Sequence, residues 1–264
     1  MPSVLSHGAE IYYDVRGQGP AVVFAHGMGG NAISWWQQVP HFAGLGYRVI
    51  ALDHRGFGRS TCPVAEFHPA RFPDDLRAIL DHEGIERAAL VCQSMGGWTG
   101  LPTALQTPER VGALVLCGTP GGIVTDKIVD VGSQMFRRLA GGAQSGTAAL
   151  APGYAERQPA MAYLYGRIRS LNPGLPPDVL VRFVDPSSRV PEEALASYAV
   201  PTLLLSAEWD AIFPLPAMRD VAALIPGAEL VSFPDLGHSA YFEGADRFNQ
   251  VVETFLAGHR GRFA

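Results

Sequence analysis

Three residues whose side chains can combine into a nucleophilic catalyst, Ser94, Asp210 and His238, each stand just past a short apolar run. A serine hydroxyl is a poor nucleophile until a base with a pKa near neutrality accepts its proton, and histidine is the side chain with that pKa. The imidazole in turn needs a carboxylate to fix its tautomer and stabilise its charged form. The chemistry expected of such a set is attack on a carbonyl carbon through a covalent acyl-enzyme.

Ser94 lies in the stretch Leu-Val-Cys-Gln-Ser-Met-Gly-Gly, where an apolar run stops at the serine and small residues follow at once. This pattern predicts a strand, a sharp turn and the start of a helix. Such an elbow lifts the hydroxyl out of the packed layer and directs new helix N–H groups at the reacting oxygen. The alternative is that Ser94 only caps the following helix, which is a common role for serine.

Asp210 and His238 reach Ser94 only if the strands before them are parallel neighbours in one sheet, because the carboxyl ends of parallel strands meet at one edge. Glu208 and Asp235 are the alternative acids. His238 can also be a loop histidine without a chemical role, and Asp210 a simple turn residue. The three residues together favour the catalytic interpretation.

A glycine-rich segment, His26-Gly-Met28-Gly-Gly30, follows the buried-strand pattern of Ala21 to Ala25. Glycines let the backbone pass close to a neighbour and turn its N–H groups inward, as an oxyanion site requires. An ordinary glycine-rich loop is the alternative. We expect His26 to fix this loop by hydrogen bonding.

The elements that must position these residues alternate between strands and helices. Such alternation predicts an α/β fold with a mostly parallel sheet covered on both faces. The expected strands are a pair within 4–15 turning at His7-Gly8, then 21–25, 47–52, 88–92, 111–117, 201–206 and 229–233. The expected helices are 34–44, 72–83, 95–106, 217–225 and 244–257.

Regular alternation stops at Thr119-Pro-Gly-Gly122 and resumes near residue 200. Because a structureless loop of this length is improbable in a compact domain, we interpret residues 120–199 as a mostly helical cap inserted into a core of residues 1–119 and 200–264. Its arginines could hold a substrate carboxylate, but a solvated surface position explains each of them better. The sequence singles out none of them.

Composition excludes several classes of function. At 264 residues with 47% hydrophobic residues and a net charge of -5, the chain can bury a full core and has no basic footprint for nucleic acid or an anionic membrane. The segment 53–60 contains glycines and arginines but lacks the spacing of a phosphate-binding loop. Three cysteines, Cys62, Cys92 and Cys117, form no disulfide framework. With no signal peptide or long apolar stretch, we expect a cytoplasmic protein that acts on a small molecule.

These motifs in this order identify the chain as similar to the α/β-hydrolase fold family of serine hydrolases, over nearly all of its length except the cap. The resemblance implies that Ser94, Asp210 and His238 are the nucleophile, acid and base, and that the N–H groups of Met28 and Met95 form the oxyanion hole. It also implies a structural role for the segment 53–60.

The chain departs from the family pattern Gly-x-Ser-x-Gly at its first position, which is Cys92. The position must be small, and cysteine is small enough to fit. Cys92 itself lies inside the predicted strand, on the wrong side of the turn to be the nucleophile. A serine at the elbow argues against epoxide and carbon–halogen chemistry, for which relatives of this fold use a carboxylate.

The expected function is hydrolysis of a carboxylic ester or lactone of a small, largely apolar substrate, without metal or cofactor. The resemblance also allows an enol-lactonase, a carbon–carbon bond hydrolase or a cofactor-free perhydrolase with the same triad. A receptor that retains the fold but turns over slowly or not at all is the alternative of another class. Four aromatic residues flank the motif ends and could line an apolar pocket: Trp36, Trp98, Trp209 and Phe213.

Overall fold

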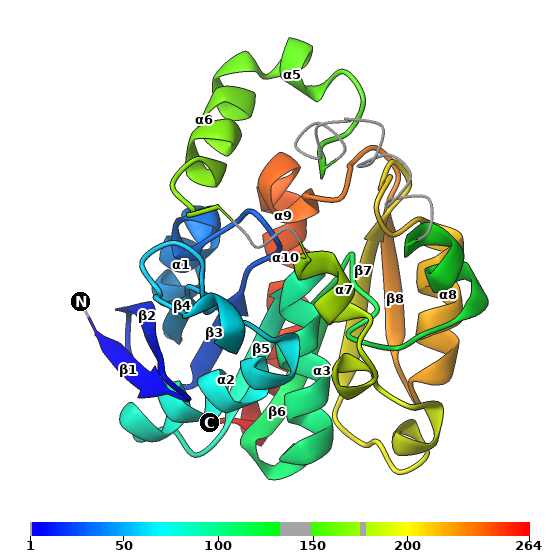
Figure 1. The fold of residues 1–264 in the computed structure, drawn as a ribbon. Helices are drawn as coiled ribbons and strands as arrows, with labels where there is room; N and C mark the ends of the chain where they lie inside the picture. Colours follow the sequence, from blue (N-terminus) through cyan, green and yellow to red (C-terminus); the bar gives the residue numbers. More distant parts are fainter. Residues whose placement is uncertain (1, 133–148, 175–177) are drawn as a thin grey trace.

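The structure, a computed structural model, describes residues 2–132, 149–174 and 178–264. Its central feature is an eight-stranded sheet with the strand order β1-β2-β4-β3-β5-β6-β7-β8 (Figure 1). β1 and β2 are antiparallel to their neighbours, and β4, β3, β5, β6, β7 and β8 are mutually parallel. The strands are β1 Ser3–Ser6, β2 Ala9–Arg16, β3 Ala21–Ala25, β4 Arg48–Leu52, β5 Ala88–Gln93, β6 Val111–Cys117, β7 Thr202–Ala207 and β8 Glu229–Phe233.

The central strands are continuous apolar runs because both faces of the sheet are covered. Every residue of β3, β5, β6 and β7 is buried, whereas in β2 at the antiparallel side buried residues alternate with exposed or half-buried ones from Ala9 to Asp14. Continuous burial is typical of parallel sheets between helical layers. The expected α/β class and parallel sheet are therefore confirmed, and the carboxyl ends of β5, β7 and β8 lie at one edge.

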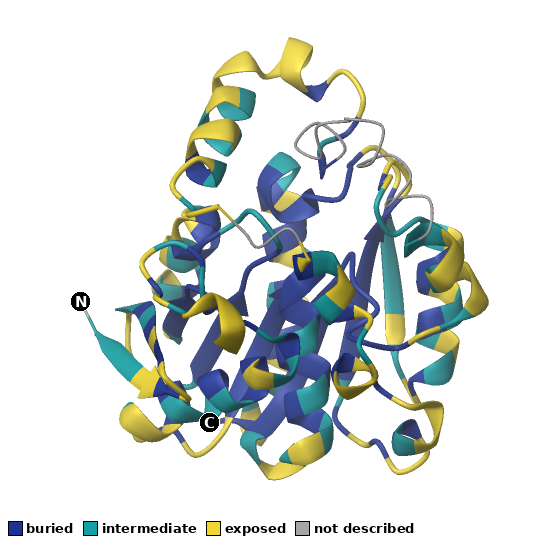
Figure 2. Cartoon of the chain, viewed as in Figure 1, coloured by how far each residue is buried: buried dark blue, intermediate teal, exposed yellow. Residues whose placement is uncertain are grey.

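Two helical layers enclose the sheet, and the central strands between them are buried (Figure 2). α2, α3 and α8 pack against one face, and α1 and α10 pack against the other. The helices are α1 Gln38–Gly44, α2 Phe72–His82, α3 Gly97–Gln106, α5 Tyr154–Arg157, α6 Pro159–Arg169, α7 Val179–Phe183, α8 Leu215–Leu224, α9 Ala240–Glu243 and α10 Ala245–His259.

Two helices expected from periodicity are each divided by a short 3-10 turn. In place of the expected helix 34–44, the structure has a 3-10 turn at Ala32–Trp35 followed by α1. The Asn31 side chain accepts the N–H of Ile33, and the Ser34 Oγ accepts the N–H of Asn31. This reciprocal capping favours a tight turn. Residues 95–106 likewise begin with a 3-10 turn over Ser94–Gly96.

The described part of residues 120–199 contains α5, α6 and α7, with α5 and α6 at one end of the molecule (Figure 1). Ile123 and Val190 form an isolated parallel bridge between the beginning and the end of this segment. α6 contributes Ile168 to the core beneath it and packs Tyr165 edge-on against Phe242 of α9.

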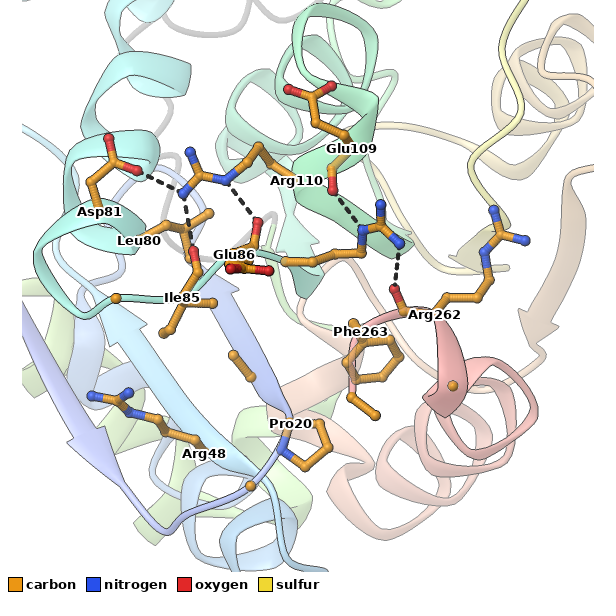
Figure 3. Close-up of a pocket in the computed structure, with 16 residues that line it drawn as sticks. Pro20, Arg48, Leu80, Asp81, Ile85, Glu86, Glu109, Arg110, Arg262 and Phe263 are labelled. Atoms are coloured by element: carbon orange, nitrogen blue, oxygen red, sulfur yellow. Dashed lines mark hydrogen bonds and ion pairs between the residues drawn. The ribbon is translucent and has the colours of Figure 1, made fainter.

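A surface groove of about 1280 Å³ lies at the opposite edge of the sheet (Figure 3). Its lining includes the first residues of β3 and β4 and the residues just before β5 and β6, so it marks the amino ends of the parallel strands. Arg110 binds the carbonyls of Ile85 and Glu86, and Arg87 binds those of Glu109 and Arg262. These arginines join strand ends, and the groove is separate from the edge that carries Ser94.

Candidate active site

Ser94 stands at the elbow between β5 and α3 with a backbone φ of 49°, in the left-handed region. Among the described non-glycine residues only His7 shares this feature. Left-handed backbone at a non-glycine residue is costly and persists where the surrounding structure imposes it. Two residues later, the turn runs close to β3 at Gly96, where a Cβ would overlap the carbonyl oxygen of Ala25.

Cys92, the departure from the family pattern, is accommodated by a second glycine. A Cβ on Gly100, one helical turn into α3, would lie 2.6 Å from the Cys92 Sγ. The thiol therefore occupies the space that a larger side chain at residue 100 would take. Burial raises the pKa of the Cys92 thiol well above its ordinary value, so this sulfur stays protonated.

The glycine-rich segment after β3 passes directly over the elbow. A Cβ on Gly27 would overlap the Gln93 side chain and lie 2.9 Å from the Cβ of Ser94, so only glycine permits this approach. Gly29 has a φ of 89°, and the Gly30 N–H donates to the Gly27 carbonyl at 2.9 Å. Within the described residues, neither the Met28 nor the Met95 N–H donates to a protein acceptor.

His26 holds this loop in the way the sequence predicts. Its Nδ1 lies 2.8 Å from the Gly27 carbonyl oxygen, and its Nε2 accepts the His54 N–H at 3.0 Å. Nδ1 therefore carries the proton and the ring is neutral. Complete burial lowers the pKa of His26 to about 4, in agreement with this tautomer.

Asp210 follows β7, His238 follows β8, and the two side chains are paired. The His238 Nδ1 donates to Asp210 Oδ2 at 2.8 Å, and both residues are buried. The other carboxylate oxygen, Oδ1, accepts the N–H groups of Ile212 and Phe213, each at 2.8 Å. A carboxylate held in this way fixes the ring's orientation and leaves Nε2 on the side away from Asp210.

The alternative acids have other surroundings. Glu208 is exposed, and Asp235 forms a surface ion pair with Arg247 at 2.7 Å. The geometry therefore pairs His238 with Asp210 and not with either rival.

Two positions that the sequence reasoning missed lie against the acid–base pair or its loop. Gln93 Nε2 donates to the His238 carbonyl at 3.2 Å, so the residue before Ser94 fixes the histidine loop. A Cβ on Gly118 would lie 3.0 Å from Asp210 Oδ2 and 3.1 Å from His238 Nδ1. A glutamine ending a fully buried strand was the available signal for the first. Gly118 had none, because its neighbours are distant in sequence.

The four aromatic residues fall into two groups. Trp98 and Met28 pack against the apolar cluster that contains Met95, and Trp98 meets Phe183 of α7 edge-on. The centroids of the Phe213 and His238 rings are 6.0 Å apart. Trp36 and Trp209 are 41% and 55% exposed. Thus Trp98 and Phe213 adjoin the site residues, while the other two tryptophans lie at the surface.

The segment 53–60 is tied into the core beside the glycine-rich loop. The buried Arg55 guanidinium donates to both carboxylate oxygens of Asp75 in α2, at 2.6 and 2.8 Å. Asp53 accepts the N–H groups of Ala32 and Arg59. The Arg55 guanidinium and the Asp53 carboxylate of this segment are therefore both bound to structural partners.

The residues that the structure describes contain no group of three or more His, Cys, Asp or Glu side chains arranged to hold a metal ion. None of the helices in these residues combines the length and apolarity needed to cross a membrane.

Comparison with known proteins identifies the family of this chain. The profile of the family described as "alpha/beta hydrolase fold" matches residues 20–144, and that of "TAP-like protein" matches residues 182–260. A 2-hydroxy-6-oxo-6-phenylhexa-2,4-dienoate hydrolase of Burkholderia cepacia is 31% identical over 94% of this chain and 91% of its own length. The chain belongs to the α/β-hydrolase fold family.

Solved structures of other α/β-hydrolases superpose over nearly the whole chain. An N-acyl homoserine lactone degrading enzyme has a TM-score of 0.80 and 27% identity, covering 96% of this chain and all of that one. A meta-cleavage product hydrolase from Pseudomonas fluorescens has a TM-score of 0.75 and 25% identity, covering 98% of both chains. The α/β-hydrolases that are similar to this chain thus include a lactone-degrading enzyme and a meta-cleavage product hydrolase.

Proposed function

We propose that this α/β-hydrolase is a serine hydrolase that cleaves a carboxylic ester or lactone of a small, largely apolar substrate. The observation that carries the proposal is the buried hydrogen bond between His238 and Asp210, held beside the strained elbow of Ser94 by Gln93. An imidazole whose Nδ1 is fixed by a carboxylate can use Nε2 as a base.

The reaction follows from these positions. His238 Nε2 takes the proton of the Ser94 hydroxyl as its oxygen attacks the carbonyl carbon. The N–H groups of Met28 and Met95 stabilise the resulting oxyanion. The protonated imidazole then gives its proton to the leaving alcohol, and an acyl-enzyme remains. Water, deprotonated by His238, attacks the acyl carbon, and collapse of the second oxyanion returns the proton to Ser94 and releases the acid.

Residues 120–199 would form the cap over this site and supply part of its walls. α7 brings Phe183 against Trp98 in an apolar cluster that also includes the side chains of Met28 and Met95. An apolar wall beside the oxyanion donors favours a largely apolar substrate.

A carbon–carbon bond hydrolase is the second candidate, favoured by one contact in addition to the relatives. Arg169 of α6 directs Nη1 at the Met28 carbonyl, 3.5 Å away, and within the described residues its guanidinium has no carboxylate partner. A cation at this place suits a substrate that carries a carboxylate. The substrate named for the Burkholderia cepacia relative is such a compound.

The proposed partner is a small molecule, and the proposed location is the cytoplasm. The net charge of -5 offers no basic surface for nucleic acid. Cys92 and Cys117 are free and buried among strands, which suits a reducing compartment.

The test is turnover of p-nitrophenyl acetate and of 2-hydroxy-6-oxo-6-phenylhexa-2,4-dienoate by wild type, Ser94→Ala and His238→Ala. We expect both variants to lose turnover of the preferred substrate by at least about 1,000-fold and to keep the wild-type circular dichroism spectrum. Faster turnover of the dienoate would select the second candidate. Near wild-type activity in either variant would refute the triad.

The receptor alternative has its own test. A fluorophosphonate probe should label wild type and leave Ser94→Ala unlabelled. A Ser94-dependent adduct together with negligible turnover of esters, lactones and the dienoate would favour a receptor.

A further inference from the structure

The segment that follows α6 is joined to the glycine-rich loop by the side chain of Asn172. Its Nδ2 donates to the Gly29 carbonyl at 2.8 Å, and its Oδ1 accepts the Gly58 N–H at 2.9 Å. Weaker contacts join the same amide to the Arg169 carbonyl at 3.3 Å and to Asn31 Nδ2 at 3.4 Å. Both ends of the amide are therefore used, and each holds a different loop.

The first of these loops contains Met28, the proposed oxyanion donor. Gly27, Gly29 and Gly30 surround Met28, and glycine gives a backbone wide conformational freedom. His26 fixes the part before Met28 through the Gly27 carbonyl. After Met28, the side-chain contacts to loop carbonyls come from the end of α6 and the segment that follows it, one from Asn172 to Gly29 and a longer one from Arg169 to Met28.

The second loop makes Asn172 an anchored support. Gly58 belongs to the segment in which Asp53 accepts the N–H of Ala32, three residues after Gly29, and the N–H of Arg59. The glycine-rich loop, Asn172 and the Asp53 segment therefore form a closed ring of contacts. If Gly29 moved, Asn172 would lose its hydrogen bond to Gly29 or to Gly58, or the loop that contains Gly58 would have to move as well.

We propose that Asn172 is a positioning residue for the oxyanion hole, acting through Gly29 on the direction of the Met28 N–H. The inference rests on the proposed function. The role requires an amide, because it needs a donor for Gly29 and an acceptor for Gly58 on one short side chain. Aspartate keeps the acceptor and loses the donor, and it sets a negative charge against the Gly29 carbonyl.

The variants are Asn172→Ala and Asn172→Asp, with Ser170→Ala as the matched control. Ser170 is exposed on the same chain segment, and its Oγ donates to the Arg167 carbonyl, away from the loop. Each variant is assayed for kcat and KM with p-nitrophenyl acetate and with its thiono analogue, in which sulfur replaces the carbonyl oxygen. Sulfur is a weak hydrogen-bond acceptor, so an intact oxyanion hole favours the oxygen ester.

We expect both Asn172 variants to lower kcat for the oxygen ester by about 10- to 100-fold, with KM within about threefold of wild type. Their preference for the oxygen ester over the thiono ester should fall, and Ser170→Ala should resemble wild type in every respect. Thermal unfolding of each variant verifies that it is folded, and Asn172→Asp serves if the alanine variant is not.

The inference is overturned if a folded Asn172 variant keeps the wild-type kcat. It is also overturned if the loss lies in KM with an unchanged oxygen-to-sulfur preference, because that pattern indicates a substrate contact or a general structural role. Failure of the proposed function gives a different result: wild type would not hydrolyse esters, or Ser94→Ala would retain the activity.

Discussion

The carboxylate of Asp210 receives three hydrogen bonds, two from backbone N–H groups and one from His238. An amide at this position can keep an acceptor for the backbone, but to do so it turns its NH₂ group toward the imidazole. The histidine would then be held in the wrong tautomer for accepting a proton from Ser94. The negative charge beside the imidazole and the orientation of the His238 ring therefore both depend on Asp210.

We therefore predict that Asp210→Asn lowers kcat/KM by about 1,000- to 10,000-fold while the fold is retained. Glu208→Gln, two residues earlier and exposed, should stay within about twofold of wild type. Steady-state kinetics with the preferred substrate check both variants, and circular dichroism checks the fold. The opposite ranking would assign the acid role to Glu208.

Residue types alone indicated most of the candidate site. The order of Ser94, Asp210 and His238 and their positions after strands predicted a shared edge of the sheet, since parallel strands end at one edge, and in the structure His238 is paired with Asp210. Sequence could not choose between Asp210 and Glu208 as firmly, because the choice depends on side-chain direction after β7. The bond from Gln93 to the His238 loop was also out of reach, since it joins residues 145 positions apart.

At the scale of elements, β5 and α3 meet so closely that the elbow depends on paired small residues. The Cys92 thiol fills the space above Gly100, and a Cβ at residue 100 would also lie 2.8 Å from Leu114 Cδ1. Alanine normally stabilises a helix by about 1 kcal/mol relative to glycine. Here overpacking should exceed this gain.

We predict that Gly100→Ala lowers the free energy of unfolding by about 1–3 kcal/mol, and that it costs less in a Cys92→Gly background. The control is Gly166→Ala in α6, where a Cβ has no neighbour within 4 Å and the change should be neutral or stabilising. Urea unfolding of the single and double variants gives the coupling. Equal costs in both backgrounds would contradict the proposed contact.

Helical periodicity located most of the helices but not the 3-10 turns that precede two of them. Periodicity reports which face of an element is apolar, whereas the turn at Ala32–Trp35 depends on the reciprocal bonds of Asn31 and Ser34. The short α9 was also missed. Four residues are too few to carry a periodic pattern, and α9 follows the functional loop directly.

At the scale of the whole molecule, Glu243 joins the end of α9 to the segment that follows residue 148. Its carboxylate accepts the N–H of Ala151 at 2.8 Å and that of Gly237 at 3.1 Å. Burial is the main cause that raises its pKa from 4.5 to about 7, although both hydrogen bonds and His238 act in the opposite direction. The folded protein therefore holds this proton at pH values where the unfolded chain has released it.

We predict that Glu243 makes the free energy of unfolding decrease as pH rises from about 4.5 to about 7. In this window the folded state binds more protons than the unfolded state, and ionisation of the unfolded chain favours unfolding. Glu243→Gln should remove this contribution, so its stability relative to wild type should increase across the window. Urea unfolding at several pH values tests this, with Glu156→Gln, an exposed position in α5, as the control. A constant difference would contradict the prediction.

The left-handed backbone at residue 94 has a consequence for inactive descendants of this chain. Glycine adopts a φ of 49° without the steric cost that serine meets. A lineage freed from the need for turnover would thus gain stability by losing the hydroxyl. Only selection for the reaction would then keep a serine at this turn, and a glycine at residue 94 would give a more stable but inactive protein.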